Sequence, residues 1–184
     1  DPAALETEIR AALARDPGDP AALTNMAWLL RHQGQLRDAV LHCDAAIRAA
    51  PDFVPAWLER GFVLASGGSM EAARACYERV IVLEPGNAPA HAGLASIMAR
   101  DGDSAEARGH ASAALEVDPG NPIAAAALAT MLIESGEANA AEALLAPLAE
   151  AHGAPSADRA LLLGQLADAR DRLGKTAEAF ACYA

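Results

Sequence analysis

The 184-residue sequence is poor in positive charge. Lysine and arginine together number 14 against 25 aspartate and glutamate residues, which gives a formal net charge of −11 at pH 7. Lys175 is the only lysine. Binding to nucleic acid or to anionic membranes depends on clustered cations that contact phosphates, and the sequence contains no basic stripe. We therefore expect neither nucleic acid as a partner nor insertion into a membrane.

Cysteine and long apolar runs are also scarce. The sequence has three cysteines, Cys43, Cys76 and Cys182. An odd number predicts no disulfide framework and favours a reducing compartment. No apolar run reaches the roughly 18 residues of a membrane span, and residues 1–184 show no signal-peptide pattern. We expect a cytoplasmic location. A periplasmic one stays open, because both ends of the sequence look cut from a longer polypeptide.

Aromatic residues number only seven, whereas alanine occurs 49 times. Alanine is the best helix former and lets helices approach closely. No alternation of apolar and polar residues typical of strands competes with this preference. The composition therefore predicts an all-α fold.

Prolines and glycines recur with a period of 34 residues. Such a period predicts stacked helical hairpins, in which each repeat contacts only its neighbours. Within one hairpin the glycine ends the first helix in a left-handed conformation, and Asp19, Asn87, Asn121 and Ser156 are predicted N-caps. The periodic residues are Pro17, Pro51, Pro85 and Pro119 in one phase, and Gly34, Gly68, Gly102 and Gly136 in another.

The second repeat carries a recognisable pattern, in which Trp57 is expected to lie between the two helices of its own hairpin. The repeat follows the pattern W-x2-L-G-x2-Y, A-x3-F, P and departs from it mainly by Arg60, which stands where leucine is usual. The chain thus resembles the tetratricopeptide repeat family, bacterial type. The resemblance implies a right-handed superhelical solenoid of antiparallel helix hairpins. The matching residues are Trp57, Gly61, Leu64, Gly68, Ala73, Tyr77, Val80 and Pro85.

The period divides residues 1–184 into one array of repeats. The fourth repeat is irregular: Gly153 replaces the periodic proline, and Pro147 is expected to kink or split the second helix. Gly174 follows Gly136 by 38 residues, which predicts one added turn in a helix from about Ala157 to Leu173. A longer loop is the alternative. The predicted segments are the second helix of a partial repeat at 1–16, repeats at 20–53, 54–87 and 88–121, the irregular repeat at 122–155, and a truncated repeat at 156–184.

No residue pattern predicts catalysis. Leu173 to Thr176 look like the end of a phosphate-binding loop, but Ala169 stands where that loop needs glycine and no strand precedes it. His42, Cys76, His110 and Cys182 share a repeat phase, and equivalent positions on stacked helices lie about 8–10 Å apart, too far to share a metal ion. His91 is expected to be a core residue. We expect no catalytic residue, metal ligand or cofactor in this segment.

The resemblance implies that the first helices line a concave groove that binds a partner peptide or helix. Trp28, Leu58 and Phe62 would supply an apolar wall, and Arg31, His32 and Arg100 its cations. Alternatively, Trp28 and Phe62 pack against a neighbouring helix. The same phases carry Ala126, Ala127, Glu134, Gln165, Asp168 and Arg172 in later repeats. The predicted partner-binding residues are Thr24, Asn25, Trp28, Arg31, His32, Leu58, Glu59, Phe62, Ser96, Arg100 and Thr130.

Three functional hypotheses follow. The leading one is a noncatalytic scaffold for protein–protein interaction. The second is that the repeats belong to a larger enzyme, because residues 174–180 are similar to the last repeat of bacterial tetratricopeptide proteins that continue into a sulfotransferase domain; the catalytic domain would then lie beyond Ala184. The third is self-association through the open ends of the array.

Two binding motifs known from the tetratricopeptide family are absent. The lysine–asparagine clamp that some family members use for carboxylates is absent, since Thr24 and Trp28 occupy its positions. An asparagine ladder is also absent, since only Asn25 fits it.

Overall fold

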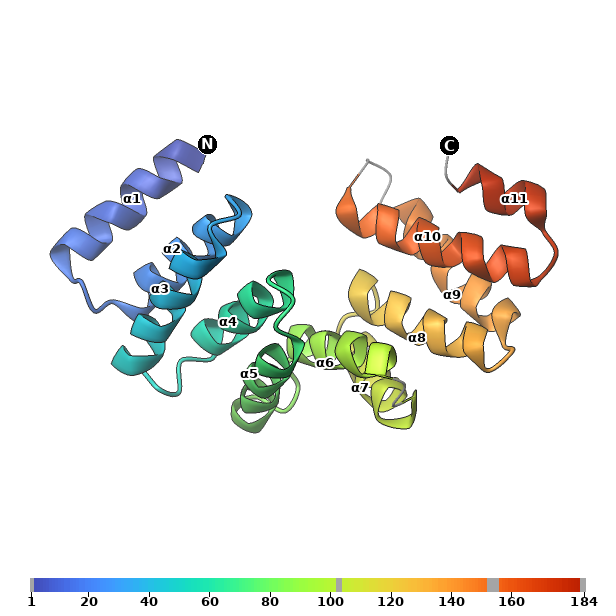
Figure 1. Ribbon diagram of the computed structural model, residues 1–184, viewed down its shortest axis with the longest axis horizontal. Coiled ribbons are helices and arrows are strands. Elements are labelled where there is room, and N and C mark those ends of the chain that lie inside the picture. The colour runs from blue at the N-terminus through green and yellow to red at the C-terminus, as the bar shows by residue number, and fades with distance from the viewer. Residues whose placement is uncertain (1, 102–103, 152–155, 183–184) are drawn as a thin grey trace. The chain divides into compact units, whose positions relative to one another are not determined.

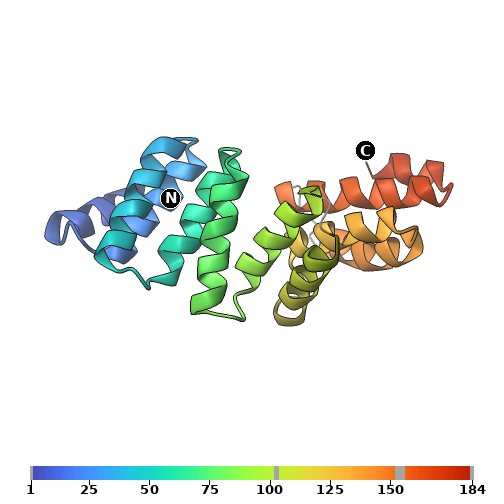
Figure 2. The same cartoon turned by 60° about the horizontal axis from the view of Figure 1, so that its bottom comes forward.

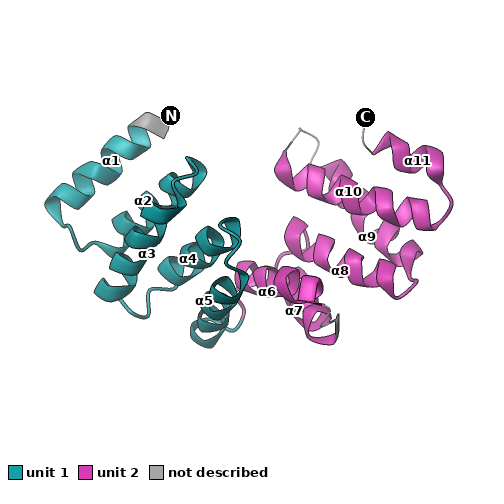
Figure 3. Ribbon diagram, in the orientation of Figure 1, with its two compact units in different colours: residues 1–85 teal, residues 86–184 magenta. Residues whose placement is uncertain are grey.

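The computed structural model describes residues 2–101, 104–151 and 156–182, which form eleven α-helices and no strand (Figure 1). The chain divides into two compact units, residues 1–85 (unit 1) and residues 86–184 (unit 2) (Figure 3). Unit 1 contains α1 (Pro2–Arg15), α2 (Pro20–His32), α3 (Leu36–Ala49), α4 (Val54–Ser66) and α5 (Met70–Leu83). Unit 2 contains α6 (Ala88–Asp101), α7 (Ser104–Val117), α8 (Pro122–Glu134), α9 (Ala138–Ala151), α10 (Ala157–Arg172) and α11 (Thr176–Ala181).

The predicted caps begin the helices. Asp19 Oδ1 accepts from the Ala21 amide at 2.9 Å, and Asn121 Oδ1 accepts from the Ala124 amide at 3.0 Å. Each cap satisfies an amide that has no partner within its helix. Asn87 and Ser156 accept from the amides of Ala90 and Arg159 in the same way.

The glycine turns end the first helices of the hairpins. Gly34 has φ 76°, and its amide donates to Arg31 O while the Gln35 amide donates to Leu30 O. This pair of bonds is the Schellman motif, which needs a left-handed residue at the position that Gly34 occupies. Gly68, Gly136 and Gly174 have φ values of 78°, 83° and 72°, so the predicted turns are confirmed there. Gly102 lies outside the described residues.

Consecutive helices pair into hairpins within each unit, as Figure 1 and Figure 2 show. In unit 1, Ile9 of α1 packs against Met26 and Leu29 of α2. The α2 and α3 helices meet through the fully buried Ala27, Ala39 and Cys43. Alanines at these contacts bring the helix axes close together.

The core of unit 2 has the same character. Ala95 and Met98 of α6 pack with Ala107 and Ala111 of α7. A larger cluster joins α8, α9 and α10, with Leu145 and Leu162 both fully buried. The first helices α6, α8 and α10 also pack against one another in that order. They are the helices that the resemblance assigns to a groove.

Two local predictions have clear outcomes. The α10 helix has 16 residues against 13 in α2, α4 and α8, so the predicted added turn lies in this helix. The α9 helix runs unbroken through Pro147, so proline does not split it. Trp57 is only partly buried, and its Nε1–H donates to Pro51 O at 2.8 Å. The indole of Trp57 is thus tied to the turn before α4, and its expected place between the two helices stays a prediction. Tyr77, at 2% exposure, is a large residue buried at the α4–α5 contact, against Gly61 and Phe62.

Candidate functional site

A groove runs along the first helices of unit 2. It consists of two adjoining hollows of about 390 Å³ and about 340 Å³, which share Thr130, Glu134 and Gln165. We call the surface around these two hollows the unit 2 groove. The first hollow is lined by Ser96, Ala99, Arg100, Ile123, Ala126, Ala127, Thr130, Glu134, Leu161 and Gln165. The second is lined by Thr130, Ile133, Glu134, Gln165, Asp168, Asp171 and Arg172.

Small side chains make up the middle of the groove. Because the side chains of Ala126 and Ala127 on α8 are small, the backbone of a bound peptide can approach this helix closely. The Thr130 hydroxyl on α8 lies 3.0 Å from Gln165 Oε1 on α10 and 3.0 Å from Ala126 O on its own helix, so its single proton is shared between two acceptors. This bond joins two first helices and holds the Gln165 amide in place, with its NH₂ group as a donor. Donors of this kind are what an extended peptide needs for its carbonyl groups.

The two edges of the unit 2 groove differ in chemistry. Ile123 and Leu161 lie near the starts of α8 and α10, and they keep 37% and 39% exposure. Charged side chains gather toward the ends of α6, α8 and α10: Arg100, Glu134, Asp168, Asp171 and Arg172. One edge can therefore take apolar side chains and the other charged ones.

A third hollow adjoins the second. It has a volume of about 190 Å³ and shares Asp168 and Asp171 with its neighbour. Its other lining residues are Ala167, Thr176, Ala179 and Phe180, of which Phe180 is 72% exposed. The row of hollows thus continues from α10 to α11.

The predicted aromatic wall lies in unit 1. Trp28 is 41% exposed and its ring contacts His32 at a tilt of 39°, with centroids 4.0 Å apart. His32 Nδ1 lies 2.8 Å from Trp28 O, one turn earlier. This bond fixes the His32 ring under the indole. Trp28 therefore offers an exposed, oriented ring on α2.

Phe62 and Arg31 are engaged within unit 1. Arg31 Nε donates to Glu59 Oε1 at 2.7 Å, and its guanidinium lies over the Phe62 ring at 5.5 Å from the centroid. Phe62 also meets Tyr77 in an edge-to-face contact, with centroids 5.9 Å apart. Burial raises the pKa of Tyr77 well above its usual range. For Phe62, the alternative that it packs against a neighbouring helix agrees with these contacts.

The other predicted residues divide between the units. Thr24 and Glu59 are 8% and 6% exposed, and the Thr24 hydroxyl donates to Pro20 O at 2.7 Å. These two side chains are occupied in the fold, so we leave them out of the proposed surface. Asn25 is exposed and Leu58 partly buried. Ser96, Arg100 and Thr130 are brought together in the first hollow of unit 2.

The set of partner-binding residues predicted from the sequence leaves out most of the unit 2 groove. Gln165, Glu134, Asp168 and Arg172 occupy the groove phases of the repeat, and that phase was the signal that could have found them. The aromatic residues drew the selection toward unit 1 instead. The lining residues outside the predicted set are Ala99, Ile123, Ala126, Ala127, Ile133, Glu134, Leu161, Gln165, Asp168, Asp171 and Arg172.

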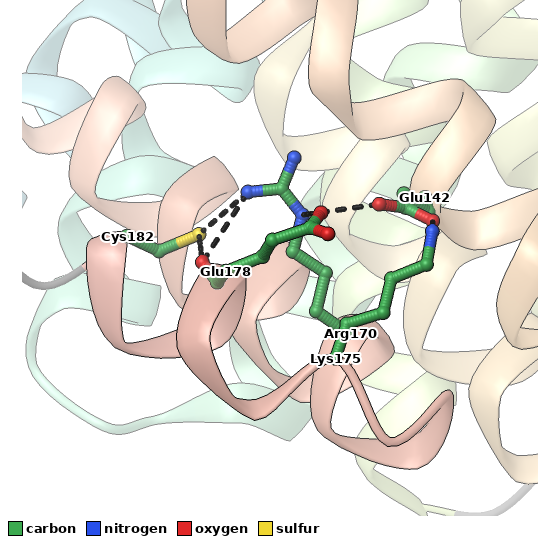
Figure 4. Close-up of polar contacts among 5 residues, drawn as sticks. All are labelled: Glu142, Arg170, Lys175, Glu178 and Cys182. Carbon is green, nitrogen blue, oxygen red and sulfur yellow. Dashed lines mark hydrogen bonds and ion pairs between the residues drawn. The ribbon is translucent and has the colours of Figure 1, made fainter.

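Lys175, which raised the phosphate-loop hypothesis, belongs to a structural cluster (Figure 4). Its Nζ lies 2.7 Å from Glu142 Oε2, and Arg170 Nε lies 3.1 Å from Glu142 Oε1. Lys175 and then Arg170 hold the pKa of Glu142 below its usual value. Arg170 Nη1 also reaches Cys182 Sγ at 3.3 Å. The cluster ties α9, α10 and α11 together.

The residues that share the histidine and cysteine phase have separate partners. His42 contacts Asp38 O, Cys76 contacts Arg60 and Cys182 contacts Arg170. His110 Nδ1 lies 2.8 Å from Nδ1 of His91, which is partly buried. In the part of the chain that the structure describes, no three side chains are grouped to bind a metal ion.

Family models for the tetratricopeptide repeat match residues 9–40, 55–122 and 98–166. The chain belongs to the tetratricopeptide repeat family. No curated protein matches it. Among the described residues, no helix is both long and apolar enough to span a bilayer.

Solved structures share the fold. A tetratricopeptide repeat protein from Parabacteroides merdae matches with TM-score 0.73 and 21% identity, over 96% of this chain and 69% of that one. The repeat protein YrrB, described as having an unusual peptide-binding site, matches with TM-score 0.67 and 16% identity, over 95% and 88%. A chain of the APC/C hetero-tetramer Cut9-Hcn1 matches with TM-score 0.87 and 14% identity, over 99% of this chain and 36% of that one. The chain thus spans about a third of that last structure.

Proposed function

We propose that this chain is a noncatalytic protein-interaction scaffold that binds a segment of a partner protein in the unit 2 groove. The observation that carries the proposal is the pair of adjoining hollows along α6, α8 and α10. Their low alanine floor, the fixed Gln165 amide and the exposed Ile123 and Leu161 are what a bound peptide would contact. The peptide-binding site of YrrB, on the same fold, supports this class of function.

The other hypotheses have less support. The matched families and structures are those of repeat proteins, and they lend no support to the sulfotransferase alternative. Self-association through the ends of the array stays a prediction. So does a second contact surface in unit 1, where Trp28 is the one predicted aromatic residue exposed by more than a third.

Selection from a random peptide library tests the proposal. Peptides of about 12 residues are selected on the wild-type chain, and their affinities are measured by isothermal titration calorimetry. The double variant Ile123→Ser with Leu161→Ser removes the apolar edge, and both positions are exposed enough to tolerate the change. Burying one exposed apolar side chain of this size is worth about 1.5–3 kcal/mol when burial is complete, and the double variant removes two such contacts. We therefore expect the selected peptides to lose about tenfold or more in affinity.

The matched control removes two exposed apolar side chains outside the unit 2 groove. Leu41→Ser with Val117→Ser changes residues that are 63% and 61% exposed, and it should leave the affinity unchanged. Equal losses in both variants, or a selection that enriches no peptide, would contradict the proposal.

A further inference from the structure

The charges around the unit 2 groove are unbalanced. Its lining includes three carboxylates, from Glu134, Asp168 and Asp171, against the two guanidinium groups of Arg100 and Arg172. The whole chain carries a net charge of −11. All three carboxylates line the second hollow, together with Arg172, so the excess of negative charge lies there. The exposed Ile123 and Leu161 lie at the other edge of the groove.

The two aspartates are placed to act together. Asp168 and Asp171 are three residues apart on α10, so they share one face of that helix. Both line the second and the third hollow. Within the described part of the chain, neither carboxylate makes an ion pair with a side chain. Glu142, on the neighbouring α9, is by contrast held between Arg170 and Lys175.

We propose that the partner segment in the unit 2 groove is cationic and amphipathic. Its apolar side chains would lie against Ile123 and Leu161, and a lysine or arginine side chain would lie between Asp168 and Asp171. This inference rests on the proposed function and narrows the chemistry of the partner. Phe180, exposed in the third hollow beside the two aspartates, adds an aromatic face that favours a cation.

Charge complementarity favours a cationic segment over the two other candidate occupants of the groove, a second copy of the chain and an acidic segment. A second copy of the chain would bring another net charge of −11 to the same surface, and like charges in an interface oppose association. An acidic segment could pair with Arg100 and Arg172 but would meet three carboxylates. A cationic segment gains more ion pairs than it loses.

Two matched 14-residue peptides test the inference on the full chain. Both are labelled with fluorescein and built of leucine and alanine, with lysine on one helical face in the first and glutamate in the second. Fluorescence anisotropy at 0.15 M salt reports their affinities. The lysine peptide should bind at least tenfold more tightly than the glutamate peptide. Equal affinities, or tighter binding of the glutamate peptide, would overturn the inference.

Two double variants with the same charge change separate specific binding from general attraction to an acidic protein. Asp168→Asn with Asp171→Asn should weaken binding of the lysine peptide about tenfold. Asp158→Asn with Glu150→Gln alters two exposed carboxylates outside the groove lining and should change it less than threefold. Equal losses in both variants would show that the attraction is nonspecific and would overturn the inference.

The library peptides distinguish this inference from the proposed function. If the selected peptides need Ile123 and Leu161 for binding but are acidic, the groove binds peptides and the inference of a cationic partner is wrong. If no selected peptide depends on those residues, the proposed function fails and the inference fails with it.

Discussion

The ring of Tyr77 on α5 lies directly against the backbone of Gly61 on α4. A β-carbon added at Gly61 would come within 2.8 Å of Tyr77 Cδ1, closer than side chains tolerate. The ring is 2% exposed and has no room to retreat. We therefore expect Gly61→Ala to lower the free energy of unfolding by about 1–3 kcal/mol, the usual cost of overpacking. Urea denaturation followed by circular dichroism measures this change.

Gly109→Ala is the matched control. Gly109 also lies inside a helix, α7, but an added β-carbon there meets no atom within 4 Å. Alanine should stabilise this helix by about 0.5–1 kcal/mol, because glycine loses more backbone entropy on folding. The two substitutions should therefore shift the midpoint in opposite directions. A shift of the same sign in both would contradict the packing described for Tyr77.

The ion pair between Arg31 and Glu59 joins α2 to α4 in unit 1. The Glu59 side chain is 8% exposed and that of Arg31 is 21% exposed. Glu59→Ala leaves the guanidinium beside Phe62 without its carboxylate, and we expect a loss of about 2 kcal/mol in stability. Arg31→Met combined with Glu59→Leu should cost less than Glu59→Ala alone, since neither charge is then left unpaired. Chemical denaturation of the three variants tests this order; a larger loss in the double variant would refute it.

The Glu142 cluster makes the stability of the α9–α11 region depend on pH. Lys175 and Arg170 lower the pKa of Glu142 from its ordinary value of 4.5, so the folded state binds fewer protons than the unfolded state near that pH. The stabilisation is therefore complete above pH 4.5 and is lost as the pH falls through the lowered folded pKa. Glu142→Gln should be less stable than wild type at pH 7 and should match it more closely at pH 3.

Thermal unfolding of wild type and Glu142→Gln between pH 7 and pH 3 measures this difference. Glu150→Gln, an exposed position on the same helix, controls for the loss of one negative charge. A stability difference that stays constant over the whole range would show that the carboxylate charge of Glu142 is not what stabilises the cluster.

Local features of the fold could be predicted from the sequence, because each depends on a few neighbouring residues. The caps at Asp19 and Asn121 and the turn at Gly34 follow from side-chain chemistry and from the freedom of glycine. The added turn in α10 followed from the spacing of Gly136 and Gly174 alone.

Contacts between helices were harder to predict. Arg31 counted as a cation of the binding surface, yet its partner Glu59 lies 28 residues away and was itself expected to face the partner. Trp57 matched the family pattern but is only partly buried, while Arg60 beside it reaches Asp44 and Cys76 on two other helices. Repeat phase gives the helix face of a residue. It does not give the ion pairs and volumes that decide which side chains stay exposed.

An NMR titration of the ¹⁵N-labelled chain with a library-selected peptide tests the central claim most directly. The account predicts that the largest amide shift changes fall in α6, α8 and α10, around Ser96, Thr130, Gln165 and Asp168, with smaller changes in α7 and α9. Changes confined to the second helices, or to Trp28 and its neighbours in unit 1, would contradict the proposal that the unit 2 groove is the binding site.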